Sequence, residues 1–358
     1  MKNLTLFSAF VFLAFIFSGC PFIKTNPKYT EGVFPDYPVN FVEINSEYDD
    51  YNSMLPVVQY DQYIYFSSNR NSGGQNFDIV GDNLHIWWDM ETGLLTVDNS
   101  KPYYDLSYTD TLLDMINTSA NEFGPYALSY WTPYNVDDYA RYDIVTYSSN
   151  FDSDDYTSKF VYFKSDGNGV GSYHGPFDIN LINTSIDAQY SSFFTEEENF
   201  YYGETDPAKF RQMIFNLNLD GRTGIYSIDL PANDDFIDML KNDTVISPSM
   251  IHAINSDDED KCPFVNNQFL VFSSNREGGL GGYDLYYSRY ENGNWTAPVN
   301  FGEGINSAFD EFRPVTIVVP GFINDLMIYS SNRPGGEGGY DLYYVGLPFK
   351  ITNLLYSD

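Results

Sequence analysis

Three short phrases recur along the chain in a fixed order, and this internal repetition constrains the fold more than any other feature. The first phrase is Ile-Asn, followed by Ser or Thr and then by acidic residues. It occurs five times, at intervals of 51 to 72 residues, beginning at Ile44, Ile116, Ile182, Ile254 and Ile305. Repetition at such a period indicates an architecture in which every repeat is one supersecondary unit.

The second phrase is built on Ser-Ser-Asn, and three of its copies continue with Arg. It begins at Tyr65, Thr146, Val271 and Ile328. In the third unit we place it at FYYGETD, which begins at Phe200. The third phrase precedes Ile-Asn and begins at Tyr37, Gly175 and Ala297. Three phrases in the same order in about five units predict five copies of one structural module.

Each unit is expected to contain four short strands. In the fifth unit, residues 313–319, 325–329 and 340–345 are apolar runs, and residues 330–339 form a glycine-rich turn. In the fourth unit, residues 294–301 supply the fourth strand. The runs lack clean polar–apolar alternation, which is typical of strands buried on both faces of a sheet. The pattern therefore predicts an all-β fold, a β-propeller of four-stranded blades.

Five blades are expected, with the ring closed by an N-terminal strand. The stretch YPVNFVE from Tyr37 resembles the end of a fourth strand but precedes the first unit, so it is expected to complete the last blade. Six blades are the alternative, if residues 82–107 contain a degenerate blade. The chain has 32 Tyr and 29 Phe, a load of rings that stacked blades would bury.

Together the phrases resemble the WD40-like, TolB-type β-propeller repeat. The similarity is close in units one, four and five, partial in units two and three, and covers residues 38–358. The resemblance implies a protein of the Gram-negative cell envelope, where such propellers often accompany OmpA-like peptidoglycan-binding domains. No OmpA-like segment accompanies the repeats in this sequence.

The N-terminus predicts an export signal and a lipid anchor. Lys2 is followed by a 14-residue apolar run from Leu4 to Phe17, which is too short to span a bilayer. Ser18 and Gly19 then precede Cys20, as in a bacterial lipobox, although Phe17 stands where Leu is usual. We expect residues 1–19 to be a signal peptide, residues 20–36 the lipidated Cys20 and a tether, and residues 37–358 the propeller.

The alternative at this end of the chain is an ordinary signal peptide with a chance cysteine. If Cys20 is lipidated, Cys262 is the only other cysteine, and we expect it to be a buried small hydrophobic residue. No Asp follows Cys20, so the family rule for lipoproteins implies the outer membrane, with the periplasmic or surface face left open.

Repeated charges predict an ion pair inside each of three blades. Units one, four and five have Arg after Ser-Ser-Asn and acidic residues at both of two neighbouring positions; the other two units lack the Arg and keep one acidic residue. This covariation within one chain predicts bidentate pairs. The pairs are Arg70 with Asp50, Arg276 with Asp260, and Arg333 with Glu311. The alternative is a ring of these groups that grips a ligand.

Charge and motifs exclude several functions. With 18 basic and 50 acidic residues the net charge is −32, which argues against nucleic-acid binding. His85, His174 and His252 lack metal-ligand spacing, so neither a metal site nor a cofactor is expected. The acidic stretches at 152–155 and 257–260 lack the glycine and closing glutamate of a calcium loop, and solvated loops are the favoured interpretation.

We therefore expect a non-enzymatic scaffold that binds an envelope protein or peptide and is held to the membrane by its N-terminal lipid. The alternative is a carbohydrate-binding or glycosidase-type five-bladed propeller. Its acidic and sugar-stacking residues would have to be unique to particular blades rather than repeated. Such candidates are Asp89, Asp137, Asp138, Glu204, Trp87, Trp88 and Trp131.

Overall fold

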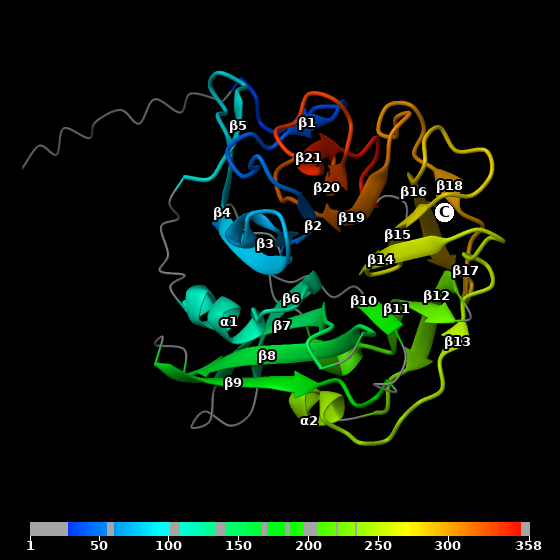
Figure 1. Ribbon diagram of the computed structural model, residues 1–358. Helices are drawn as coiled ribbons and strands as arrows, with labels where there is room; N and C mark the ends of the chain where they lie inside the picture. Colours follow the sequence, from blue (N-terminus) through cyan, green and yellow to red (C-terminus); the bar gives the residue numbers. More distant parts are fainter. Residues whose placement is uncertain are drawn as a thin grey trace, which may run out of the picture.

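Five antiparallel sheets surround a common centre in the computed structural model (Figure 1). The structure describes residues 28–55, 61–100, 108–132, 140–152, 154–166, 170–182, 187–196, 206–219, 221–232 and 235–351. The predicted all-β propeller of five four-stranded blades is confirmed. The expected signal peptide and Cys20 lie outside the described residues. In the described part of the chain, no helix is both long and apolar enough to cross a membrane.

The first three blades follow the chain, each with its first strand nearest the centre. Blade 1 contains β2 (Asp50–Met54), β3 (Asp61–Ser68), β4 (Asp78–Trp88) and β5 (Leu95–Asp98). Blade 2 contains β6 (Glu122–Thr132), β7 (Ala140–Ser149), β8 (Thr157–Ser165) and β9 (Gly171–Asp178). Blade 3 contains β10 (Asp187–Phe194), β11 (Gln212–Leu219), β12 (Arg222–Asp229) and β13 (Ser249–Met250).

Blade 4 has a divided outer strand, and blade 5 is completed from the N-terminal side. Blade 4 contains β14 (Asp260–Asn266), β15 (Phe269–Ser274) and β16 (Asp284–Glu291), and both β17 (Asn294–Trp295) and β18 (Val299–Asn300) pair with β16. Blade 5 contains β19 (Glu311–Ile317), β20 (Leu326–Ser331), β21 (Asp341–Gly346) and β1 (Val39–Asn40). Because Val39 of β1 pairs with Tyr344 of β21 and Asn40 with Tyr343, the expected N-terminal closure of the ring is confirmed.

The alternative of a sixth blade is excluded by the β4–β5 hairpin. Residues 82–88 and 95–98 belong to these two strands of blade 1, and His85 of β4 pairs opposite Asp98 of β5. The helix α1 (Tyr108–Ile116), which the sequence did not lead us to expect, follows, with Leu112 and Ile116 buried against the blades. The other helical segments are α2 (Phe236–Leu240), η1 (Arg70–Ser72) and η2 (Pro207–Lys209).

Neighbouring blades pack face to face, so the inner strands are buried on both sides. All six residues of β15 and all six of β20 are buried. Apolar residues at consecutive positions, such as Phe269 to Phe272, therefore point alternately into the two interfaces between blades. This burial explains why the strand-forming runs in the sequence do not alternate.

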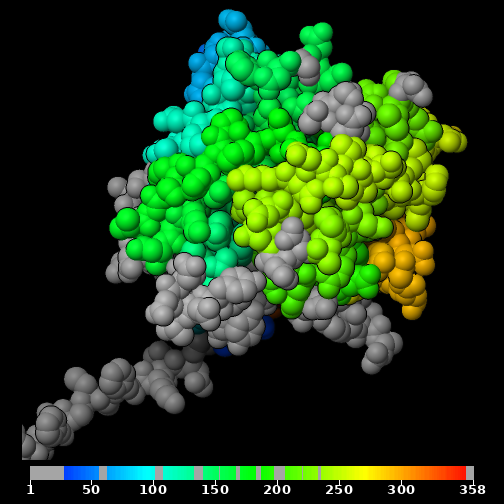
Figure 2. All heavy atoms as spheres, turned by 90° about the horizontal axis from the view of Figure 1, so that it is seen from below, coloured from blue at the N-terminus to red at the C-terminus, as the bar shows by residue number. Residues whose placement is uncertain are grey.

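The outer surface joins elements that are distant in sequence. Figure 2, viewed from below, shows blade 2 in green against the yellow-green connection between α2 and β13. The N–H of Asn180 donates to the carbonyl of Leu240 at 3.3 Å, and that of Ile246 donates to Leu181 at 2.9 Å. Residues 28–36, expected to belong to the tether, pack on blades 1 and 5; the ring of buried Phe34 stacks on Phe322 at 4.2 Å.

Candidate binding site on the propeller axis

The loops that carry the first two repeated phrases meet on one face of the ring, as the repeats predict. In blade 1 the N–H of Asp49 donates to Asn69 Oδ1 at 3.0 Å. In blade 5 the N–H of Asp310 donates to Asn332 Oδ1 at 2.9 Å. The connection before the first strand of a blade is thus fastened to the connection after its second strand. We call this side of the ring the loop face.

The expected arginine–carboxylate contacts are formed on this face. In blade 5, Arg333 Nη2 lies 2.8 Å from Glu311 Oε1 and donates to the carbonyl of Ile305 at 2.7 Å. Its Nε donates to Ser331 Oγ at 3.2 Å. The corresponding Arg70–Asp50 contact measures 2.7 Å, and Arg276 pairs with Asp260 in the same manner.

The bidentate geometry expected for these pairs is wrong. In blade 1, Arg70 contacts only Oδ1 of Asp50, because its Nε also donates to Ser68 and its second nitrogen to a backbone carbonyl. Asp50 Oδ2 instead accepts from the N–H of Ser46 at 2.6 Å and from its hydroxyl at 2.8 Å. The carboxylates of the three pairs have no exposed surface, so each pair joins buried segments of one blade.

The first strand of every blade has a β-bulge, which sequence analysis missed. The bulge residue stands eight positions after the Ile of the first phrase and has a φ of 46° to 60°. Such a left-handed conformation favours glycine, yet four of the five residues have side chains. The constant spacing from Ile was the signal that could have found them. The five residues, which we call the axial floor, are Asn52, Gly124, Tyr190, Cys262 and Arg313.

Contacts among these residues close the centre of the ring. Asn52 Nδ2 donates to the Tyr190 hydroxyl at 3.1 Å, and the Arg313 guanidinium lies 5.4 Å from the centroid of the Tyr190 ring. Arg313 has no exposed surface and donates to the carbonyl of Pro263 at 2.6 Å. Burial lowers the pKa of Arg313 and raises that of the Cys262 thiol. The axial floor therefore holds blades together and forms the base of a pocket.

One side of this pocket is aromatic. Tyr51 follows the acidic pair on β2, Phe312 follows it on β19, and Phe77 and Tyr340 immediately precede the third strands of blades 1 and 5. The Tyr51 centroid lies 4.9 Å from Phe77 and 5.9 Å from Tyr340, and Phe312 lies 5.8 Å from Tyr340. Burial raises the pKa of both tyrosines, which stay protonated donors. We call these four residues the aromatic wall.

In blade 3 the repeated aromatic positions hold polar residues. In blade 5, Glu311 pairs with Ser331, and Ser331 pairs with Asp341 on the next strand. In blade 3 the equivalent positions are Ala188, Leu217 and Gly224, which pair in the same order. Thr223 therefore corresponds to Tyr340, and Gln189 to Phe312. The Ser-Ser-Asn position of blade 3 is thus at residues 216–218, and our placement at Phe200 is wrong, because a long connection separates β10 from β11.

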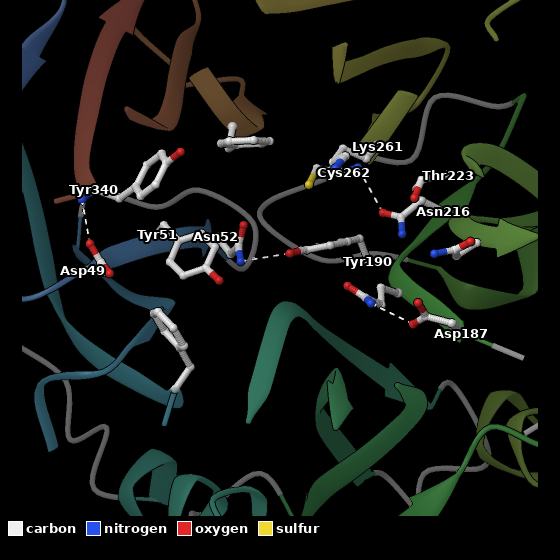
Figure 3. A pocket seen from close by; sticks show the side chains of 14 residues that line it. Asp49, Tyr51, Asn52, Asp187, Tyr190, Asn216, Thr223, Lys261, Cys262 and Tyr340 are labelled. Carbon is white, nitrogen blue, oxygen red and sulfur yellow. Dashed lines mark hydrogen bonds between the residues drawn. The ribbon is translucent and has the colours of Figure 1, made fainter. Parts of the chain in front are cut away.

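The opposite side of the pocket is consequently hydrophilic, and we call it the polar wall. Figure 3 shows Tyr340 and Tyr51 across the hollow from Asn216, Thr223 and Asp187. The hollow has a volume of about 370 Å³. Its polar wall is formed by Asp187, Gln189, Asn216, Asn218, Thr223 and Lys261.

Two groups of the polar wall carry formal charge. Asp187 Oδ1 accepts from Gln189 Nε2 at 2.8 Å. Lys261 Nζ lies 2.9 Å from Glu259 and 4.5 Å from the centroid of the Tyr283 ring. Burial works against the charge on Lys261, but hydrogen bonds with Tyr283 and Glu259 outweigh it, so its pKa is raised. The polar wall thus presents one carboxylate and one ammonium among amide and hydroxyl groups.

A further carboxylate, Asp49, lines the pocket beside the aromatic wall. Its Oδ1 accepts from the N–H of Tyr340 at 2.9 Å, a bond that joins blade 1 to blade 5. Asp310 Oδ1 accepts from the N–H of Tyr283 in the same way, between blades 5 and 4. Asp49 therefore has a repeated structural task. Asp187 occupies the same place in its own repeat, but its Oδ1 accepts from Gln189, the polar residue that stands in blade 3 where blade 5 has Phe312.

The tryptophans proposed from sequence lie away from this pocket. Trp87 and Trp88 end β4, whose first residue follows Phe77 of the aromatic wall. Trp88 Nε1 donates to the carbonyl of Tyr29, and Asp89 accepts from two N–H groups of its own turn. These N–H bonds lower the pKa of Asp89. Asp137, Asp138 and Glu204 lie outside the described residues.

Trp131 lines a second hollow, of about 1110 Å³, at the far end of β6. Asp206 and Asp235 line it as well, but both are helix caps. Asp206 accepts from the N–H of Ala208 at 3.1 Å, and Asp235 from that of Asp238 at 3.1 Å. This hollow does not present a pair of free carboxylates to a ligand.

The histidines and acidic stretches are distributed over other parts of the ring. His85 lies 3.4 Å from Asp98 within blade 1, His174 stacks on a tyrosine of blade 2, and His252 is exposed near β13. In the acidic stretches, Asp152 pairs with Lys159 at 2.7 Å and Asp260 with Arg276. Within the ranges that the structure covers, no three His, Cys, Asp or Glu side chains gather as metal ligands.

Comparison with known proteins finds solved structures with a similar fold but no matching family model or curated sequence. A thermostable family-43 glycoside hydrolase matches at 14% identity and a TM-score of 0.47, covering 85% of this chain and 91% of its own. The catalytic domain of the GH62 α-L-arabinofuranosidase of Coprinopsis cinerea matches at 10% identity and a TM-score of 0.48, covering 90% and 98%.

A third similar structure is an α-L-arabinofuranosidase from Lactobacillus brevis, at 11% identity and a TM-score of 0.42, covering 84% and 90%. These findings overturn two of our expectations. The resemblance to the TolB-type repeat is wrong, since the similar structures are glycoside hydrolases and no family model matches. The expectation of a non-enzymatic protein-binding scaffold is corrected as well, because the solved structures that resemble this chain are glycoside hydrolases. At these identities, the likeness assigns no substrate or residue role to this chain.

Proposed function

We propose that this propeller is a carbohydrate-active protein whose sugar site is the axial pocket. The observation that carries the proposal is that the pocket has an aromatic wall opposite a polar wall. Four aromatic rings face a side of amide, hydroxyl, carboxylate and ammonium groups. A sugar ring has the matching division, with C–H faces that pack on aromatic rings and hydroxyl edges that exchange hydrogen bonds.

The dimensions of the pocket restrict the ligand. Its volume of about 370 Å³ lies near the lower limit of small-molecule sites, which span roughly 300–1,000 Å³. A terminal monosaccharide or disaccharide unit suits such a space better than an internal segment of a polymer. The axial floor supports this mode of binding, because it closes the base and leaves the loop face as the entrance.

Asp187 is our candidate for the carboxylate that acts at the glycosidic bond. Glycoside hydrolysis generally uses a pair of carboxyl groups on either side of that bond. Asp187 lies in the polar wall at the interrupted repeat, with Gln189 as a hydrogen-bond donor. We assign no reaction role to Asp49, because its oxygens are engaged with Tyr340 and Asn69.

The test combines binding and turnover. The purified protein is screened on a glycan array and against a panel of 4-nitrophenyl glycosides, and the hits are measured again with Asp187→Asn. Asp229→Asn is the matched control, because Asp229 also accepts from a glutamine, Gln212, at 2.8 Å but lies at the other end of blade 3. We expect Asp187→Asn to lose turnover and the control to retain it.

Two results would contradict the proposal. The first is a folded protein that binds no glycan on the array and cleaves no glycoside. The second is Asp187→Asn with the same turnover and affinity as the unmodified protein. Retained glycan binding without turnover in the unmodified protein would keep the sugar site and reject the reaction role of Asp187.

A further inference from the structure

Five large apolar side chains are exposed around the end of the β4–β5 hairpin. Their exposed fractions are 43% for Val33, 54% for Trp87, 50% for Met90, 65% for Leu94 and 51% for Ile323. Scattered apolar residues are ordinary on a protein surface, but a contiguous group marks a surface that contacts another phase or molecule. We call these five residues the apolar tip.

Backbone contacts bring together the three segments that carry the apolar tip. The N–H of Tyr29 donates to the carbonyl of Met90 at 2.9 Å. The N–H of Ile323 donates to the carbonyl of Gly32, next to Val33, at 2.9 Å. The segment 29–33 therefore lies between the β4–β5 turn, which carries Met90 and Leu94, and the blade 5 loop at Ile323.

The apolar tip lies at the opposite end of blade 1 from the sugar site. Phe77 of the aromatic wall precedes β4, and Trp87 is next to the last residue of that strand. At a rise of about 3.3 Å per residue, the ten residues from Phe77 to Trp87 span roughly 33 Å. A surface that covers the apolar tip leaves the entrance on the loop face free.

The N-terminal chain indicates what covers this surface. Tyr29 packs edge-on against Trp88 at the base of the apolar tip, and Lys28 is the first described residue. Only seven residues separate Lys28 from Cys20, and the apolar run from Leu4 to Phe17 precedes that cysteine. Whether a lipid on Cys20 or the apolar run itself enters the bilayer, the chain then holds this end of the ring close to it.

We propose that the apolar tip rests on the surface of a zwitterionic lipid bilayer. Trp, Met and Leu side chains are suited to the boundary between head groups and acyl chains. Asp89 and Glu91 occupy the same turn as Met90, so a negatively charged surface would repel it. The propeller then stands on the hairpin end of blade 1, with the axial pocket directed away from the membrane.

The test uses the full chain on phosphatidylcholine vesicles, with and without brominated acyl chains that quench tryptophan fluorescence. We expect quenching in the unmodified protein, loss of most of it in Trp87→Phe, and a clear reduction in Met90→Ser/Leu94→Ser. Leu280→Ser is the matched control, because Leu280 is 42% exposed in a turn of the loop face. It should leave the quenching unchanged.

Two outcomes would overturn the proposal. Equal quenching in the unmodified protein and in Trp87→Phe would show that the apolar tip does not reach the acyl chains. A dimer in sedimentation measurements without lipid, converted to monomer by Met90→Ser/Leu94→Ser, would show that a second copy of the chain covers this surface. Addition of anionic lipid should not increase the quenching, and an increase would contradict the zwitterionic preference.

Discussion

Thr223 of blade 3 occupies the register position that Tyr340 holds in blade 5. The exchange removes one ring from the loop face and opens the hollow that both residues line. The sugar site that we propose therefore exists because blade 3 lacks the repeated aromatic residue. A tyrosine at residue 223 would occupy part of the space between the two walls.

Thr223→Tyr should close the pocket while the fold is preserved. A tyrosine is the residue that blades 4 and 5 already carry at this position, as Tyr283 and Tyr340. We expect a loss of glycan affinity of at least about tenfold, or roughly 1.4 kcal/mol, in calorimetric titration, with an unchanged Tm. Thr223→Ser is the control and should bind normally. Full affinity in Thr223→Tyr would place the sugar elsewhere.

The repeated residues predicted the fold well because each of them makes the same structural contact in each blade where it occurs. Ile-Asn and Ser-Ser-Asn fasten the loops, and their recurrence indicated five blades and the ring closure at β1. The predicted ion pairs followed from the same recurrence. Their one-oxygen geometry did not. Ser46 and Ser68 belong to the repeated phrases, but only the structure shows that they take up the other hydrogen bonds of Asp50 and Arg70.

The candidate site could not be predicted in this way. Several of its residues are those at which blade 3 departs from the repeat. Nothing in the sequence marks Thr223 or Gln189, and only the strand register shows that they stand in place of aromatic residues. The tryptophans drew attention in the sequence as rare aromatic residues. Trp87 and Trp131 nevertheless end long strands at the side of the ring opposite the loop face.

Arg333→Ala should destabilise the fold rather than weaken sugar binding. The substitution leaves the buried Glu311 carboxylate without its cation and removes one of the two donors to the Ile305 carbonyl, the other being the Tyr329 hydroxyl. Loss of one partner of a buried pair costs about 3–5 kcal/mol, and the partial exposure of Arg333 places the expected loss near the lower limit. Chemical denaturation measures this free energy of unfolding.

Arg289→Ala is the matched control for that experiment. Arg289 pairs with Glu291 at 3.1 Å in the neighbouring blade, but both side chains are partly exposed, so the loss should stay below about 1 kcal/mol. An unchanged free energy of unfolding in Arg333→Ala together with lost glycan affinity would make the repeated arginines a binding ring, the alternative that their recurrence left open.

We propose, from the sequence, that Cys20 carries the lipid that holds the protein to the outer membrane. Cys20→Ala should then appear in the soluble fraction after cell fractionation, whereas Cys262→Ala should remain with the membranes. Metabolic labelling with a fatty-acid analogue should mark the unmodified chain and not Cys20→Ala. Labelling of both proteins would reject Cys20 as the acceptor.

Glu122→Gln should reduce the dependence of stability on pH. Glu122 occupies in blade 2 the place of the paired carboxylates, but it accepts from Thr118 at 2.6 Å and from Ser149 at 2.9 Å. Burial raises the pKa of Glu122 above its ordinary value of 4.5. The folded state thus binds its proton more tightly than the unfolded state does. This contribution to stability is fully present below the ordinary value and is lost as pH rises through the raised pKa.

The free energy of unfolding of the unmodified protein should therefore gain more between about pH 7 and about pH 5 than that of Glu122→Gln. The difference between the two proteins isolates Glu122 from the relief of repulsion that acidification brings to a chain of net charge −32. Glu259→Gln is the matched control. A hydrogen bond from Tyr283 lowers the pKa of Glu259 below its ordinary value of 4.5, so its stabilisation is lost only as pH falls below that value, and the substitution should leave the gain between about pH 7 and about pH 5 unchanged. Equal pH dependence in the unmodified protein and Glu122→Gln would show that Glu122 titrates alike in the folded and unfolded chains.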